Sequence, residues 1–247
     1  MSVYAFFFLD ARQRNLYETL RKALFRHEQT IPVRELPADE ISLVLKAVLT
    51  DTPELFWFEG KWEYGRAGDR RYIRPVYTFD AAASREIQGQ LDGIGGKIVT
   101  AASAFTQDLD RARYVYDWLI SHVRYGFLSG RGQTVYDALV NRSAVCKGLS
   151  KSFQYLLKQL NCFSTLREGT LHGAGTHMWN VAGLGGNYFN VDVSMGYDSF
   201  SCLFDESRRN DQYRCFAVPD AGLSKFHTER RLPWPSLICD QDHPGGN

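Results

Sequence analysis

The sequence predicts an α+β fold in which a helix that begins at a cysteine packs against an antiparallel sheet. Residues 146–160 place apolar side chains at helical spacing, and residues 177–181 and 188–193 each alternate like a strand around a glycine-rich turn. Helical and aromatic strand patterns fill the first hundred residues. We therefore expect an N-terminal accessory region at 1–105, followed by a core and a C-terminal extension at 106–247.

The helix that begins at Cys146 carries this cysteine at the edge of its apolar stripe. The stripe consists of Leu149, Phe153, Leu156, Leu157 and Leu160, and the polar side chains Lys147, Lys151, Gln154 and Lys158 fall on the opposite side. The thiol should therefore point inward. A helix N-terminus stabilises a thiolate, so Cys146 could be a nucleophile, although a free cysteine is also a common small buried hydrophobe.

A histidine and an aspartate lie on the two predicted strands. If Leu184 and Gly185 form the turn, His177 lies directly opposite Asp192, and if Gly185 and Gly186 form it, Asp192 lies diagonally from His177. Both registers keep the two side chains on one face, because a shift of two residues preserves the alternation. A histidine that takes the thiol proton and an acid that fixes its tautomer are the parts of a nucleophilic triad.

Three segments of the chain resemble the signature of the transglutaminase-like superfamily of papain-fold cysteine enzymes. Val145–Gly148, His177–Val181 and Tyr188–Val193 are similar to the VCxGxA, HAWN and VDVTW motifs of bacterial transglutaminase-domain proteins. The resemblance extends to Gln133–Leu139, to Asp51–Phe58 and to a tail that includes His227, so it covers nearly the whole chain after about residue 35. The chain departs from the pattern at Met178, at Ser194–Met195 and at Lys147.

The resemblance implies a papain/transglutaminase-like core with a Cys146, His177 and Asp192 triad. It implies acyl transfer or amide hydrolysis through a thioester, on a protein or peptide substrate and with no cofactor. Water as the acceptor would make the protein a protease or deamidase, that is, a hydrolase, whereas an amine would give cross-linking. Another interpretation is a catalytically silent interaction or scaffold domain.

Four further residues are weighed for roles around the triad. Gln133 is either an oxyanion donor or a helix cap in a surface loop. Trp179 is a candidate for the substrate cleft. We interpret His172 as a surface loop residue and His227 as structural or at the rim of the cleft.

Composition excludes several classes of function. Lys and Arg number 29 against 28 Asp and Glu, which gives no field that would attract nucleic acid. Five cysteines in a chain of 247 residues do not suggest a disulfide framework, so we expect a reducing compartment. Dinucleotide, P-loop and zinc motifs are absent from the sequence, and with no signal peptide or membrane span we expect a cytoplasmic protein without metal, cofactor or membrane partner.

Local patterns predict the remaining elements. In order, they are a buried strand at Tyr4–Leu9, helices at Asn15–His27 and from Pro37, strands on either side of a Gly60–Lys61 turn, a strand at Arg71–Phe79, a helix at Ala81–Ala104, a helix that begins at Asp108, a short helix at Thr134–Val140 and a strand at Phe163–Leu171. Gly93–Gly96 predicts a break in the helix at Ala81–Ala104. We therefore place the boundary between accessory region and core close to Phe105.

Overall fold

The computed structural model describes residues 3–33, 36–68, 70–203 and 211–241. The chain divides into two compact units, Val3–Gln90 and Leu91–Asn247. The division falls within helix α3 (Ala81–Ala102). The functional boundary expected near residue 105, between an accessory region and a catalytic core, stays a prediction.

The N-terminal unit combines two helices with a small antiparallel sheet. Its elements are η1 (Ala5–Phe8), α1 (Ala11–Phe25), β1 (Ile31–Pro32), α2 (Ala38–Asp51), β2 (Phe58–Ala67), β3 (Arg70–Tyr77) and the first part of α3. The strands are ordered β1-β3-β2, and α1 packs against α2. Asp10 and Gln13 form a capping box, which is why α1 begins before the expected Asn15.

Three expectations for the first hundred residues are wrong. Tyr4–Leu9 is not a strand, because the buried carboxylate of Asp51 accepts the backbone N–H groups of Ala5 and Phe6, both at 3.0 Å, and η1 forms instead. Gly60 does not begin a hairpin turn. Gly60 has a φ of 93° and lies in a bulge within one continuous strand, β2. The chain reverses only after Ala67. Helix α3 runs through its glycines without a break.

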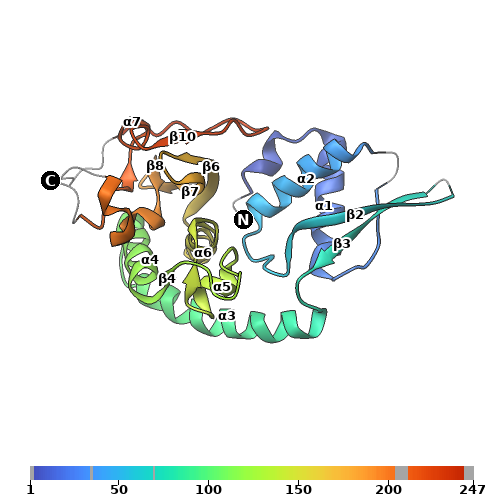
Figure 1. Ribbon diagram of the computed structural model, residues 1–247, viewed down its shortest axis with the longest axis horizontal. Helices are drawn as coiled ribbons and strands as arrows, with labels where there is room; N and C mark the ends of the chain where they lie inside the picture. The colour runs from blue at the N-terminus through green and yellow to red at the C-terminus, as the bar shows by residue number, and fades with distance from the viewer. Residues whose placement is uncertain (1–2, 34–35, 69, 204–210, 242–247) are drawn as a thin grey trace. The chain divides into compact units, whose positions relative to one another are not determined.

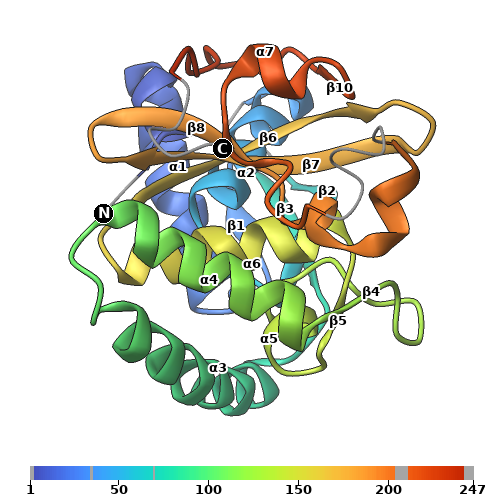
Figure 2. The same ribbon diagram turned by 90° about the vertical axis from the view of Figure 1, so that its left-hand side faces the viewer.

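The C-terminal unit contains a five-stranded antiparallel sheet of order β10-β6-β7-β8-β9. Its elements are α4 (Asp108–His122), β4 (Arg124–Tyr125), α5 (Val135–Leu139), β5 (Ser143–Ala144), α6 (Cys146–Gln159), β6 (Phe163–Leu171), β7 (Gly175–Leu184), β8 (Asn187–Val191), η2 (Val193–Gly196), η3 (Asp198–Leu203), β9 (Phe216–Val218), α7 (Asp220–Leu223) and β10 (His227–Glu229). Helices α4 and α6 lie on one side of the sheet, and α7 lies on the other (Figures 1 and 2). The predicted α+β fold, with a helix that begins at Cys146 packed on an antiparallel sheet, is confirmed.

Helix α6 is buried on more sides than its sequence pattern indicates. Lys151 and Gln154, expected on a solvent-facing side, are only 4% and 3% exposed. The reason is that α4, α5, β6 and β7 all pack against α6. The Gln154 amide donates to the carbonyl oxygen of Ser164 at 3.2 Å, which helps to offset its desolvation.

The β7–β8 hairpin adopts the second of the two registers considered from the sequence. Gly185 and Gly186 have φ values of 59° and 90°, as a tight turn with two left-handed residues requires. Asn180 therefore pairs with Val191, and Asp192, just beyond the end of β8, lies diagonally from His177.

The loop before α5 packs closely against the first turn of α6. The carbonyl oxygen of Gly132 accepts the N–H of Val145 at 2.9 Å. A Cβ atom on Gly148 would overlap this carbonyl oxygen and would lie 3.0 Å from the Cβ atom of Ala144. Glycine at position 148 thus permits the approach that holds Cys146 beside the loop.

Gly148→Ala is expected to lower the free energy of unfolding by about 1–3 kcal/mol, because backbone atoms would have to move. Thermal or urea unfolding measures the change. Gly93→Ala in α3 is the matched control, since a Cβ atom there meets nothing within 4 Å and alanine should stabilise that helix by roughly 0.5–1 kcal/mol. Equal unfolding midpoints for Gly148→Ala and the parent protein would contradict the overlap.

No helix among the described residues combines the length and the apolar character that a membrane crossing requires.

Candidate functional site

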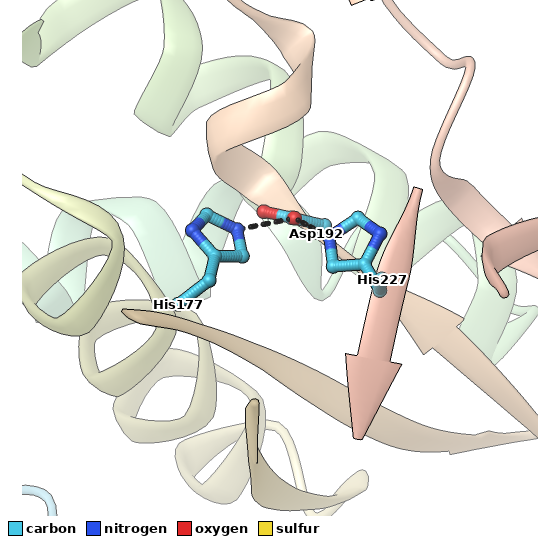
Figure 3. A group of neighbouring side chains, drawn as sticks. All are labelled: His177, Asp192 and His227. Carbon is cyan, nitrogen blue, oxygen red and sulfur yellow. Dashed lines mark hydrogen bonds and ion pairs between the residues drawn. The ribbon is translucent and has the colours of Figure 1, made fainter. Parts of the chain in front are cut away.

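His177 and Asp192 form a short, buried hydrogen bond. His177 lies near the start of β7, and Asp192 lies between β8 and η2. Nε2 of His177 is 2.6 Å from Oδ2 of Asp192 (Figure 3). The two residues are 5% and 0% exposed. The hairpin therefore brings together the imidazole and the carboxylate that the sequence predicts as partners.

Cys146 is the first residue of α6, and its side chain forms a hydrogen bond with the His177 ring. Burial by itself disfavours a charged imidazole, but the charge and hydrogen bond of Asp192, together with a hydrogen bond and the charge of Cys146, outweigh it and raise the pKa of His177 to about 10. Since Asp192 occupies Nε2, Nδ1 is the nitrogen left for the sulfur. The His177 ring therefore interacts with both the side chain of Cys146 and the carboxylate of Asp192.

Asp192 is a fully buried carboxylate that accepts three N–H groups. Its Oδ1 accepts the backbone N–H of Ser194 at 3.0 Å, and its Oδ2 lies 2.6 Å from His177 and 2.9 Å from Nε2 of His227. Burial raises the pKa of Asp192, but the charge and hydrogen bond of His177, together with the hydrogen bond of His227, more than reverse this effect and hold the pKa well below its usual range. The carboxylate is therefore an anion at neutral pH.

His227, interpreted from the sequence as structural or at the rim of the cleft, lies in the interior. It is only 4% exposed and is bonded to Asp192. Its own neighbours in the sequence carry no sign of this contact. Only the similarity of the tail to the family pointed to position 227.

Tyr125, which sequence reasoning missed, lies beside the thiol. Burial raises the pKa of Tyr125, as do the negative charges of Cys146 and Asp192, whereas a hydrogen bond from the backbone of Cys146 lowers it. The pairing of β4 with β5, which puts Tyr125 opposite Ala144, positions this side chain. The backbone N–H of Cys146 thus donates to the hydroxyl oxygen of Tyr125.

Gln133 lies in the loop that packs against α6, and its side chain faces Lys147. Nζ of Lys147 donates to Oε1 of Gln133 at 3.2 Å. Because a lysine can only donate, this contact fixes which end of the amide is oxygen and leaves Nε2 as a donor directed elsewhere. The role of Gln133 as an oxyanion donor stays a prediction.

Trp179 and His172 occupy very different environments. Trp179 is 1% exposed, and its indole N–H donates to Oδ1 of Asn190 at 3.1 Å. The side chain therefore packs in the interior beside the histidines and does not line an open cleft. His172 is exposed and bonds Oγ1 of Thr228 at 2.9 Å, in line with the surface role expected for it.

A family model matches the region that contains Cys146, His177 and Asp192. Residues 98–193, less than half of the chain, match the model of the transglutaminase-like superfamily. Residues 98–193 form a transglutaminase-like domain. The matched range contains Cys146, His177 and Asp192 and ends one residue after Asp192, so His227 lies outside it.

Solved structures resemble the chain only distantly. They include a TGase (TM-score 0.41, 11% identity, 67% of this chain and 50% of that chain) and a candidate cysteine protease from Cytophaga hutchinsonii (TM-score 0.34, 16% identity, 54% and 61%). A third is a candidate protease from Parabacteroides distasonis ATCC 8503 (TM-score 0.31, 10% identity, 54% and 39%). The chain thus spans 39% to 61% of the lengths of these proteins. No curated protein matches the chain.

His177, Asp192 and His227 are also the donor set of a possible metal centre in the transglutaminase-like domain and its extension. One ligand atom from each lies within 4.8 Å of the others. A metal bound at both Nε2 atoms would require a proton on Nδ1 of His227, and that atom is buried without a hydrogen-bond partner among the described residues. The residues therefore fit a hydrogen-bonded cluster better than a zinc site.

The His177–Asp192 pair should make the stability of the transglutaminase-like domain depend on pH. A raised histidine pKa contributes stability that is complete below about pH 6.5, the ordinary value, and is lost as pH rises through about 10. The lowered pKa of Asp192 contributes stability above pH 3.8, which is lost as pH falls further. The difference in unfolding free energy between the parent and His177→Gln should therefore decrease, by the order of a few kcal/mol, from pH 6.5 to pH 10. Urea unfolding at several pH values tests this, and a constant difference would contradict it.

Proposed function

We propose that the transglutaminase-like domain catalyses cysteine-dependent acyl transfer or amide hydrolysis on protein or peptide substrates. Cys146 is the nucleophile, His177 is the base and then the acid, and Asp192 orients His177. The observation that carries this proposal is the position of the His177 ring, which bonds Asp192 at 2.6 Å through Nε2 and also forms a hydrogen bond with the side chain of Cys146.

In the first step the thiolate of Cys146 attacks the carbonyl carbon of a carboxamide or peptide bond. A C–S bond forms, the C–N bond breaks, and the proton on Nδ1 of His177 passes to the leaving amine. The raised pKa of His177, about 10, supports this assignment, because it keeps the imidazole protonated beside the sulfur at neutral pH. The N-terminus of α6 favours the negative charge on the thiolate.

In the second step an acceptor resolves the thioester. Water or an amine attacks the thioester carbon and gives a proton to His177, the C–S bond breaks, and the thiolate of Cys146 re-forms. With water the product is a carboxylic acid, as in a protease or a deamidase. With an amine it is a new amide, as in cross-linking.

The oxyanion of both steps would form next to the backbone N–H of Cys146, with the amide of Gln133 as a second donor. Because the oxygen of Tyr125 accepts this N–H in the structure, the substrate oxygen would have to replace the tyrosine oxygen or share the site with it. The contact from Lys147 supports the role of Gln133, since it turns the amide nitrogen away from the lysine.

The test measures both acceptors on one panel of protein and peptide substrates. Incorporation of a labelled primary amine reports transfer, and release of ammonia or of a peptide reports hydrolysis. We expect one of these signals in the parent protein and its complete loss in Cys146→Ala. Equal signals in both would refute a role for the thiol. A thiol whose alkylation rate does not respond to His177→Gln would instead indicate a silent scaffold.

A further inference from the structure

His227 reaches the proposed triad from a part of the chain that the family model does not match. Strand β10 pairs with β6 and puts His227 opposite Leu171. Nε2 of His227 lies 2.9 Å from Oδ2 of Asp192, the same oxygen that His177 contacts from the other side (Figure 3). The side chain of His227 is 1% exposed, so this contact is shielded from solvent.

The hydrogen-bonding pattern fixes the form of His227. An anionic carboxylate can only accept, so Nε2 of His227 must carry a proton. Nδ1 is buried and has no hydrogen-bond partner among the described residues. A second proton there would leave a buried N–H group without an acceptor, at a cost of roughly 1–3 kcal/mol or more. The neutral form with its proton on Nε2 fits this environment.

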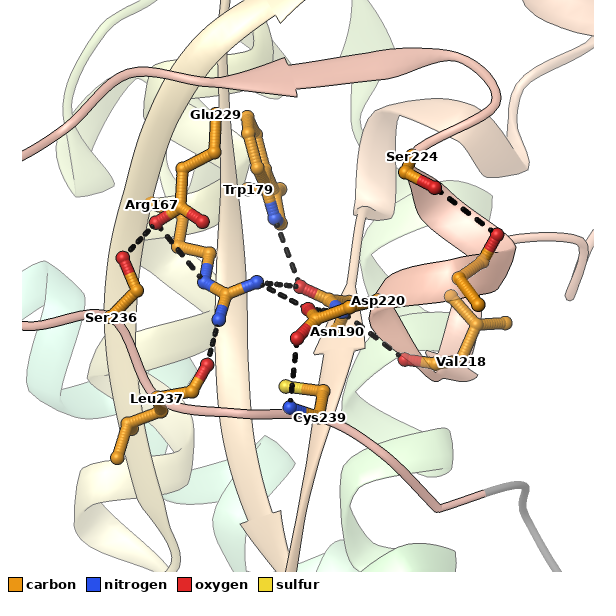
Figure 4. A network of polar contacts seen from close by, with 11 residues as sticks. Arg167, Trp179, Asn190, Val218, Asp220, Ser224, Glu229, Ser236, Leu237 and Cys239 are labelled. Carbon is orange, nitrogen blue, oxygen red and sulfur yellow. Dashed lines mark hydrogen bonds and ion pairs between the residues drawn. The ribbon is translucent and has the colours of Figure 1, made fainter.

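Trp179 packs against His227 and is itself held by a network of hydrogen bonds. The ring of Trp179 lies 5.0 Å from that of His227 at 63°, and the indole N–H of Trp179 donates to Asn190. Arg167 donates to the same oxygen of Asn190 at 2.9 Å and to Asp220 at 2.6 Å (Figure 4). Arg167 also donates to the backbone oxygen of Leu237. The segment that carries β10 is therefore fastened to the sheet on both sides of His227.

The proposed reaction creates a need for a second donor to Asp192. Each time His177 gives its proton away, its positive charge disappears while its Nε2–H remains. Asp192, at 0% exposure, would then have only neutral donors to offset its desolvation. A donor that keeps its proton throughout the cycle would hold the carboxylate anionic and aimed at His177.

We propose that His227 is a positioning residue of this active site, whose Nε2–H holds the Asp192 carboxylate in place while His177 loses and regains its proton. The inference rests on the proposed function. According to this inference, the C-terminal extension is part of the active site, although the extension lies beyond the transglutaminase-like domain.

Three substitutions separate the hydrogen bond of His227 from its packing. His227→Gln keeps an N–H donor at a similar reach, His227→Met has a similar length without a donor, and His227→Phe keeps a ring against Trp179 without a donor. A positioning role predicts that the glutamine variant stays within about 3-fold of the parent in kcat, while the methionine and phenylalanine variants lose about 10- to 100-fold with little change in KM. A packing role predicts that phenylalanine is the best replacement.

A second readout needs no substrate. Trypsin cleaves after Arg142 and Lys147, so the peptide Ser143–Lys147 contains Cys146 and no other cysteine. The folded protein is labelled with iodoacetamide at pH 6.5 and then digested, and mass spectrometry of this peptide gives the labelling rate of Cys146. This rate reports how well His177 supports the thiolate. We expect labelling of the methionine and phenylalanine variants to be about 10-fold slower than that of the parent and of His227→Gln.

The outcomes distinguish the inference from the proposed function. If labelling of the parent is no faster than that of His177→Gln, the proposed function fails. If the parent exceeds His177→Gln but all three His227 variants match the parent, only the role of His227 fails. Equal losses in all three, or the best retention in His227→Phe, would also overturn it, because the donor would then not be what matters. Thermal unfolding of each variant identifies any that do not fold, and the remaining donor and non-donor pair still decides the question.

Discussion

His177→Gln is expected to lower kcat by at least about 10⁴-fold while the protein stays folded. Glutamine can still donate an N–H to Asp192, so the buried carboxylate keeps a partner at position 177. An amide cannot take up a proton at neutral pH, so it can neither generate the thiolate of Cys146 nor protonate the leaving amine. The measurement is the initial rate with the substrate that responds best in the acceptor assay.

His172→Gln is the matched control for this substitution. His172 is exposed, and its ring contacts only a threonine hydroxyl among the contacts that the structure gives it. Its replacement should leave kcat within about 2-fold of the parent, as is typical for surface changes. A His177→Gln variant that retains a tenth or more of the parent activity would exclude His177 as the general base.

Asp192→Asn is expected to reduce kcat by about 10³- to 10⁴-fold. The parent carboxylate accepts from Ser194 through one oxygen and from both histidines through the other. Asparagine has one acceptor and one donor, so either orientation of its amide directs an N–H₂ group at a neighbouring N–H donor. His177 would also lose the charge that raises its pKa, and the imidazole would no longer remain protonated at neutral pH.

Three measurements check this outcome. Steady-state kinetics give the loss in kcat, unfolding in urea gives the cost in stability, and an NMR titration of the His177 ring protons gives its pKa. We expect the pKa of His177 to fall from about 10 toward the ordinary 6.5. If the pKa stays near 10 in Asp192→Asn, the carboxylate is not the group that supports the imidazolium.

Local patterns were sufficient to predict the parts of the site that depend on short stretches of chain. The start of α6 at Cys146 follows from apolar spacing over four turns, and β7 and β8 follow from alternation on either side of two glycines. The pairing of His177 with Asp192 was predictable without a decision on the register, because both turns that the glycines allow keep the two residues on one face.

Patterns failed where a residue far along the chain determined the structure. Asp51 captures the N–H groups of Ala5 and Phe6 and converts an expected strand into η1. Lys151 has the charge typical of a solvated helix face, yet the helices and strands around α6 bury it. Neither fact is visible in the periodicity of the segment itself, because periodicity records which residues share a face and not what covers that face.

The amino-acid order by itself determined a cysteine at a helix start and a histidine and an aspartate on one face of a hairpin. Only the tertiary structure placed His227 against Asp192, because the strand that carries His227 pairs with β6, more than fifty residues earlier in the sequence. Sheet order depends on long-range hydrogen bonds and on burial, which no local window of sequence contains. His177 and His227 share Oδ2 of Asp192 because the strand order of the sheet brings β10 beside β6.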